Sequence, residues 1–94
     1  MARTLDDYRR KLMDKIIFSS CTDDVLRFSD TAVRSLNDHR VHSYIIIRFI
    51  DKTIRDLEEF TPLCIDENQR RNIRSAVDHF RQLRKRLASN AVAE

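Results

Sequence analysis

The chain has 94 residues, and its 18 Lys and Arg against 15 Asp and Glu leave a formal net charge of +3. It contains no glycine and one proline, although average usage predicts about 7% glycine. Because glycine supplies the positive-φ positions of phosphate-binding loops and tight hairpins, this composition excludes P-loop and Rossmann enzymes and argues against all-β folds. A chain this short holds one core, so we predict a single helical domain over 1–89 and a frayed tail over 90–94.

The N-terminal half of the chain predicts two helices. The first covers residues 5–18, where apolar side chains recur every three or four positions. Thr4 and Asp7 have the spacing of a capping box, in which each side chain bonds the backbone N–H of the other residue. The second helix begins after Ser20 or Thr22, and the acidic residues of its first turn suit the positive end of the helix dipole.

A third helix is predicted from a cap at Asn37 or Asp38 to about Phe60. Residues 44–50 are rich in β-branched and aromatic side chains, which also suit a strand. We favour the helix, because a lone strand would have no partner in this chain. Helical spacing also gathers the isoleucines of this segment on one arc.

The apolar face of the third helix is unusually wide. Three residues extend it to roughly 200°, against ~100° for an ordinary surface helix: Ile45, Phe49 and Phe60. This helix should therefore contact more than one neighbour. Its second face meets either another helix of the same bundle or a second copy of the chain.

A fourth helix begins at Pro62 or Asp66 and continues to about Ser89. Thr61 ends the third helix, because the residue before a proline is pushed out of helical geometry. Short connections make sequential helices antiparallel neighbours. We therefore predict an all-α fold, a compact antiparallel four-helix bundle of up-down-up-down topology without a sheet.

Two cysteines lie in or beside the first and third connections, which this topology places at one end of the bundle: Cys21 and Cys64. We expect two reduced thiols, with a regulatory disulfide or a shared metal as the alternative. Such cysteine usage, without a secretory-type start, predicts a cytoplasmic, intracellular protein. The longest apolar run, residues 44–47, is too short to cross a bilayer, so we expect no membrane partner.

The predicted topology also separates charge along the bundle. It places acidic residues such as Asp56 and Glu58 at the end with the first and third connections, and basic residues such as Arg9 and Arg81 at the other end. We therefore expect an electrically polarised bundle.

Fourteen of the 18 basic residues are arginines, which favour forked contacts to carboxylates and phosphates. Five basic residues follow one flank of the fourth helix: Arg70, Arg74, Arg81, Arg84 and Lys85. This basic flank could follow the phosphates of a nucleic acid. Alternatively, it pairs with acidic side chains of the third helix, such as Asp51 and Glu58.

No constellation in the sequence indicates catalysis or a cofactor. His39 and His42 lie three residues apart, but a zinc site needs three or four converging ligands, so we predict no metal site. Serine, histidine and aspartate never occur at a spacing that implies a nucleophile and its base. We predict a non-enzymatic protein; an arginine-lined anion pocket between helices is the one enzyme architecture left open.

These observations predict a protein–protein interaction module. We expect it to self-associate as a homodimer through the wide apolar face of the third helix and to bind an acidic protein partner through its arginine-rich surface. The alternative is a nucleic-acid-binding protein that uses the basic flank of the fourth helix.

Overall fold

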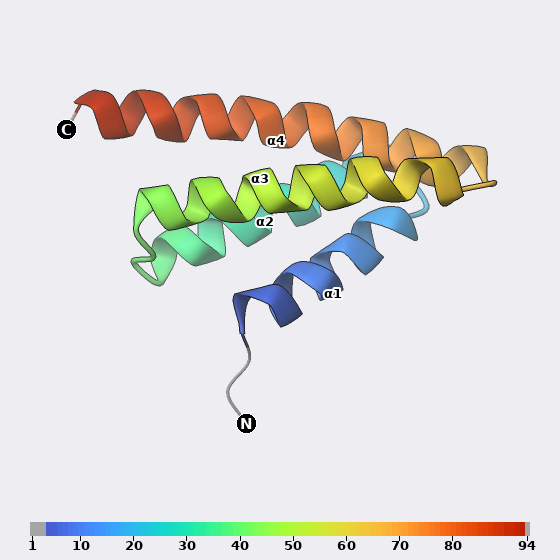
Figure 1. Ribbon diagram of the computed structural model, residues 1–94, viewed down its shortest axis with the longest axis horizontal. Helices are drawn as coiled ribbons and strands as arrows, with labels where there is room; N and C mark the ends of the chain where they lie inside the picture. Colours follow the sequence, from blue (N-terminus) through green and yellow to red (C-terminus); the bar gives the residue numbers. More distant parts are fainter. Residues whose placement is uncertain (1–3, 94) are drawn as a thin grey trace.

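The computed structural model describes residues 4–93, and the side chains of residues 4–89. Over 4–93 the chain forms four α-helices, one 3-10 helix and no strand (Figure 1). The elements are α1 (Leu5–Ile17), α2 (Thr22–Asp38), α3 (Ser43–Phe60), the 3-10 helix η1 (Thr61–Leu63) and α4 (Glu67–Ala93). Successive helices run in opposite directions, so the predicted all-α up-down-up-down bundle is confirmed.

The start of α1 agrees with the prediction from sequence, whereas the end of α4 does not. The capping box of α1 is present: Asp7 N–H donates to Thr4 Oγ1 at 3.1 Å, and Thr4 N–H donates to the Asp7 carboxylate at 3.4 Å. At the other end, α4 continues to Ala93, four residues beyond the predicted end at Ser89. Residues 90–93 of the predicted tail therefore belong to α4, and Glu94 lies outside the described residues, so fraying of this tail stays a prediction.

The connection from α2 to α3 reverses the chain without a glycine. Arg40 adopts a positive φ of 59°, the left-handed conformation that usually falls to glycine after a helix. Arg40 N–H donates to Asn37 O at 3.0 Å, and Val41 N–H donates to Leu36 O at 3.0 Å. These are the two hydrogen bonds of a Schellman motif, which satisfies the last carbonyls of α2.

Because of this motif, α3 starts later in the chain than predicted. The predicted cap at Asn37 or Asp38 is wrong, because α2 continues through Asp38 and the left-handed turn follows it. His42 caps α3 instead, accepting the backbone N–H of Tyr44 on Nδ1 at 3.2 Å. The β-branched segment over 44–50 is helical, as predicted.

The hydrophobic core surrounds α3, which packs against α1, α2 and α4. Ile46, Ile50 and Leu57 of α3 have no exposed surface. Figure 1 shows α1 crossing α3 obliquely, so that the N-terminal end of α1 stands away from α4. The wide apolar face of α3 is therefore accounted for within the chain, by three neighbouring helices.

One buried polar side chain joins the first connection to α4. Asn72 has no exposed surface, and its Nδ2 donates to Ile17 O at 3.1 Å and to Ser19 O at 2.8 Å. Buried carbonyls that lack a partner destabilise the folded state, so these bonds favour one position of the connection. Asn72 thereby holds the end of α1 against the start of α4.

Replacing Ile50 with alanine should lower the free energy of unfolding by about 3 kcal/mol, because it leaves a cavity in a fully buried site. Ile47 is the matched control, since it lies on the same helix but is only partly buried. Urea denaturation followed by circular dichroism measures both. Equal losses for Ile50→Ala and Ile47→Ala would contradict the packing of α3.

Replacing Arg40 with glycine should raise the free energy of unfolding by about 1 kcal/mol, because glycine has no Cβ to clash in the left-handed conformation. Arg40→Ala, which keeps the Cβ, should not show this gain. The same urea titration compares the two variants. A loss of stability in Arg40→Gly would show that the side chain of Arg40 contributes more than its backbone conformation costs.

Candidate functional site

Two members of the basic flank of α4 pair with α3. Arg84 Nε donates to Asp51 Oδ1 at 2.7 Å, and Arg81 Nη2 donates to Glu58 Oε1 at 3.3 Å. The pairing of this flank with α3, offered as an alternative above, is confirmed for these two residues. All four side chains are roughly half exposed, so each pair contributes only about 0–1 kcal/mol to stability.

The other members of the flank carry no ion pair among the described residues. Arg70 is partly buried, and its Nε donates to Cys64 O at 2.9 Å. Arg74 and Lys85 are exposed. Two arginines of this flank are therefore held in ion pairs, and its other three cations remain available to a ligand.

Arg70 and Arg74 border a pocket of about 230 Å³ between α3 and α4, which we call the α3–α4 pocket. Buried Ile73 and Val77 form its apolar part. Its remaining lining residues are polar or charged: Glu58, Thr61, Asp78 and Arg81. The structure thus brings three residues of the predicted basic site into one pocket, while Arg84 and Lys85 lie further along α4.

The three apolar residues predicted as an interaction face do not form one exposed surface. Phe49 is only 4% exposed, and its ring lies 6.0 Å from that of Tyr8 of α1. Phe60 is partly buried against the core near the far end of α3. Ile45 alone of the three is classed as exposed, at 39%. A homodimer through this face stays a prediction, and the buried Phe49 offers little surface to a second copy.

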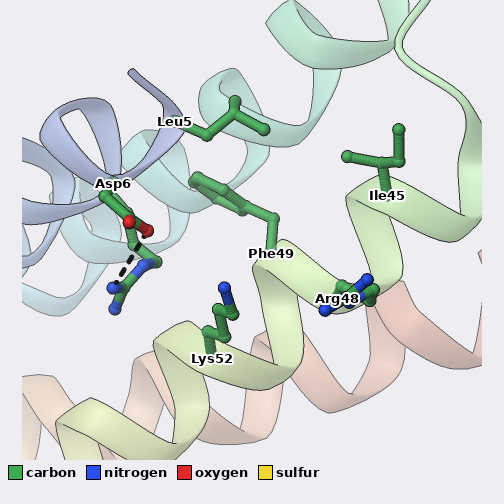
Figure 2. Close-up of a pocket in the computed structure, with 7 residues that line it drawn as sticks. Leu5, Asp6, Ile45, Arg48, Phe49 and Lys52 are labelled. Carbon is green, nitrogen blue, oxygen red and sulfur yellow. Dashed lines mark hydrogen bonds and ion pairs between the residues drawn. The ribbon is translucent and has the colours of Figure 1, made fainter.

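Ile45 and Phe49 instead line a second pocket, of about 240 Å³, between α1 and α3, which we call the α1–α3 pocket. Figure 2 shows Leu5 of α1 facing these two residues across the hollow. Arg48 and Lys52 of α3 lie at its rim and are exposed. Asp6 and Arg9 of α1 complete the lining and pair with each other. The pocket therefore combines an apolar interior with an edge that is basic on the side of α3.

Sequence reasoning missed the cations at the rim of the α1–α3 pocket. Arg48, Lys52 and Arg55 follow one another at i, i+4 and i+7, and all three are exposed on the outer side of α3. Within the described residues none of them forms an ion pair. The sequence did carry a signal for them, because their helical spacing places all three on the side of the helix opposite the apolar arc.

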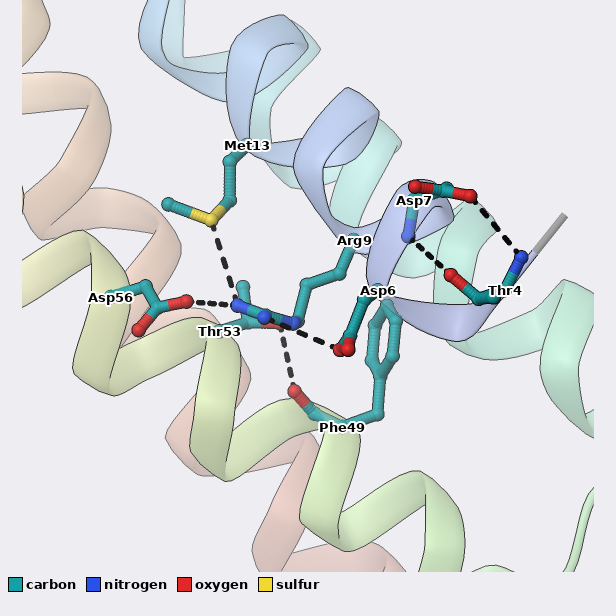
Figure 3. A network of polar contacts seen from close by, with 8 residues as sticks. All are labelled: Thr4, Asp6, Asp7, Arg9, Met13, Phe49, Thr53 and Asp56. Atoms are coloured by element: carbon teal, nitrogen blue, oxygen red, sulfur yellow. Dashed lines mark hydrogen bonds and ion pairs between the residues drawn. The ribbon is translucent and has the colours of Figure 1, made fainter.

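A polar network beside this pocket fastens α1 to α3 (Figure 3). The guanidinium group of Arg9 forms an ion pair with Asp56 of α3 and a longer one, at 3.4 Å, with Asp6 of its own helix. Met13 Sδ lies 3.9 Å from Arg9 Nη1. The Arg9 side chain is only 12% exposed, and these carboxylates compensate its buried charge.

The predicted separation of charge along the bundle is wrong for four of its residues. Arg9 pairs with Asp56, and Arg81 pairs with Glu58, although each pair was assigned to opposite ends. Long arginine side chains reach along neighbouring helices, and the ion pair with Asp56 places the Arg9 guanidinium group against the C-terminal half of α3. Arg3, another predicted member of the basic end, lies outside the described residues.

Both cysteines, His39 and His42 make only local contacts, whereas His79 Nε2 of α4 lies 2.6 Å from Asp30 Oδ1 of α2. Cys21 is exposed, whereas Cys64 is buried with Sγ 3.6 Å from Phe60 O, and both are free. His39 Nδ1 lies 2.7 Å from Ser35 O, while His42 caps α3. Among the described residues, no three or more His, Cys, Asp or Glu side chains are grouped so that they could hold a metal ion. None of the described helices has the length and apolar character that crossing a bilayer requires.

Comparisons with protein-family models, with curated proteins and with solved structures found no match for this chain. The functional interpretation therefore depends on the two pockets and on the charges around them.

Replacing Asp56 with asparagine should lower the free energy of unfolding by about 1–3 kcal/mol, because the buried charge of Arg9 loses its interhelical partner. Glu58→Gln, which breaks an exposed pair, should change it by less than about 1 kcal/mol. Urea titrations of the two variants provide the comparison. An equal effect would show that Arg9 does not anchor α1.

Proposed function

We propose that this chain is a non-enzymatic protein–protein interaction module that binds an acidic segment of a partner protein in the α3–α4 pocket. One observation carries this proposal. Arg70 and Arg74 lie one helical turn apart at that pocket, and within the described residues neither forms an ion pair. Two adjacent guanidinium groups without a carboxylate partner favour binding of an external carboxylate.

The position of Arg70 supports this role. Its Nε is occupied by the Cys64 carbonyl, and no hydrogen bond within the described residues uses its two terminal nitrogens. Those nitrogens form the planar fork that binds a carboxylate through two parallel hydrogen bonds. Because Arg70 is partly buried and already hydrogen-bonded, it loses less conformational freedom on binding than a fully mobile arginine.

Exposed cations elsewhere on the molecule, which has a net charge of +3, also favour an acidic partner. Arg48, Lys52 and Arg55 expose positive charge along α3, and Lys85 exposes it along α4. Such a field attracts an acidic surface and raises the rate of encounter, especially at low salt. The buried apolar part of the pocket offers contact area to the side chains that flank the carboxylate.

A protein partner fits this surface better than a nucleic acid does. Arg81 and Arg84 of the basic flank already pair with acidic residues of α3. Glu58 and Asp78 also line the α3–α4 pocket and repel any anion there, so they favour a partner that places one carboxylate on Arg70 and Arg74 over a continuous run of phosphates. Nucleic-acid binding through this flank is therefore the competing outcome of the experiment below. We further propose a cytoplasmic location, where two free cysteines remain reduced.

The double variant Arg70→Gln/Arg74→Gln should weaken the binding of a fluorescent glutamate-rich peptide at least tenfold, since about 1.4 kcal/mol corresponds to tenfold in Kd. Fluorescence anisotropy at low salt measures this binding. The matched control, Arg71→Gln/Arg86→Gln, removes the same charge from exposed residues of α4 that do not line the pocket. Thermal melting establishes that both variants are folded.

Three results would contradict the proposal. The control variant could lose as much affinity as the pocket variant, which would show that binding depends on net charge and not on the two arginines of the pocket. The wild-type chain could fail to bind the peptide at all. It could also bind duplex RNA of equal charge more tightly, with a steep salt dependence and loss in Arg70→Gln/Arg74→Gln, which would favour a nucleic-acid-binding function.

A further inference from the structure

We propose that a second copy of this chain inserts the segment between η1 and α4 into the α1–α3 pocket, so that copies associate head to tail. We call this segment, residues 63–67, the α3–α4 corner. Neither Arg70 nor Arg74 belongs to the two docking surfaces, so this contact goes beyond the function proposed above.

The corner carries the two most exposed large apolar side chains among those described. Ile65 is 94% exposed and Leu63 is 72% exposed. Monomeric proteins expose single apolar residues commonly, but adjacent ones at one projecting corner indicate a contact surface. Phe18, 69% exposed, belongs to the same end of the bundle, because Asn72 ties its connection to the start of α4.

The backbone on both sides of Ile65 is held in place. Cys64, which precedes it, is 2% exposed, and its carbonyl accepts a hydrogen bond from Arg70. Asp66, which follows it, accepts the backbone N–H of Asn68 at 2.7 Å in the first turn of α4. Because the backbone that carries Ile65 is already fixed, this segment loses little conformational freedom when Ile65 binds.

The α1–α3 pocket has a suitable interior for such a side chain. Leu5 and Ile45 are 41% and 39% exposed, and they meet Phe49 around the hollow (Figure 2). The pocket volume is about 240 Å³, whereas a cavity of about 150 Å³ already holds a benzene-sized molecule. A branched aliphatic side chain such as that of Ile65 therefore fits.

Charge determines which partner the pocket favours. Arg48 and Lys52 stand at its rim without an ion pair among the described residues. In the corner, the exposed Asp66 and Glu67 directly follow Ile65. Asp6 also lines the pocket but pairs with Arg9, so Arg48 and Lys52 leave the pocket with an excess of positive charge. An apolar side chain followed by carboxylates complements this pocket, and the complementarity selects the orientation of docking.

The two surfaces lie at opposite ends of α3. On α3 the pocket is lined by Ile45, Arg48, Phe49 and Lys52, which lie in the first two thirds of the helix, whereas the corner follows the last turn of α3 (Figure 1). One chain therefore cannot fill its own pocket with its own corner. The contact between copies is heterologous, so it generates a line of molecules or a closed ring. A single corner buries little area, and we expect a weak association at high protein concentration.

The test uses sedimentation velocity of the full chain up to millimolar concentration. The corner variant Ile65→Ser and the pocket variant Arg48→Glu/Lys52→Glu should each remain monomeric. An equimolar mixture of the two should form a one-to-one dimer, because one variant keeps an intact pocket and the other keeps an intact corner. All three substituted residues are exposed, so the variants should melt as the wild-type chain does.

Two control variants accompany these. Ile65→Leu keeps an apolar side chain and should associate within about threefold of the wild type. Arg55→Glu/Lys85→Glu makes the same change of charge away from the α1–α3 pocket and should also associate. Loss of association in the second control would show that overall charge, and not the rim, controls the contact.

The proposal is overturned if the wild-type chain stays monomeric at millimolar concentration, if Ile65→Ser associates as the wild type does, or if the mixed variants do not dimerise. A symmetric dimer through the face of α3 would persist in Ile65→Ser, so this variant distinguishes it from the head-to-tail contact. Binding of the glutamate-rich peptide is measured on Ile65→Ser as well. Unchanged peptide binding together with lost association separates this interface from the α3–α4 pocket.

Discussion

The burial of α3 against three other helices is the constraint from which the rest of the structure follows. Ile46, Ile50 and Leu57 are fully buried, and Phe49 closes the side toward α1. Because most of the apolar arc is used inside the chain, α3 presents mainly its charged outer side to solvent, together with Tyr44 and Ile45 in its first turn. A pocket lies on each edge of that side, one against α1 and one against α4. The central position of α3 thus determines where a partner can bind.

The absence of glycine shapes the connections between these helices. Arg40 adopts the left-handed conformation that closes α2, although its Cβ makes this conformation unfavourable. After α3 the chain turns through η1, with Pro62 in its first turn, and then through the cap formed by Asp66. These connections are ordered by hydrogen bonds and by proline. The corner that exposes Ile65 is therefore an anchored surface, which is the property that a docking segment needs.

Arginines in this protein differ in role because they differ in surroundings. Arg9 is nearly buried between α1 and α3, so its ion pair with Asp56 contributes to the packing of the bundle. Arg81 and Arg84 form exposed pairs that contribute little to stability. Arg70 is hydrogen-bonded to a backbone carbonyl but has no carboxylate partner among the described residues. Only this last arrangement leaves a guanidinium group oriented and available for a ligand.

Periodicity and capping are local properties, so the sequence by itself determined the all-α class, the capping box of α1 and the helical state of residues 44–50. It also offered, as one alternative, the pairing of the basic flank of α4 with acidic residues of α3, which holds for Arg81 and Arg84, because helical spacing places both sets along neighbouring edges. Only the tertiary structure decided that Phe49 is core and that Arg48 and Lys52 border a pocket. That pocket exists because α1 crosses α3 obliquely, and the crossing depends on packing and on the Arg9 ion pair, which join residues distant in sequence.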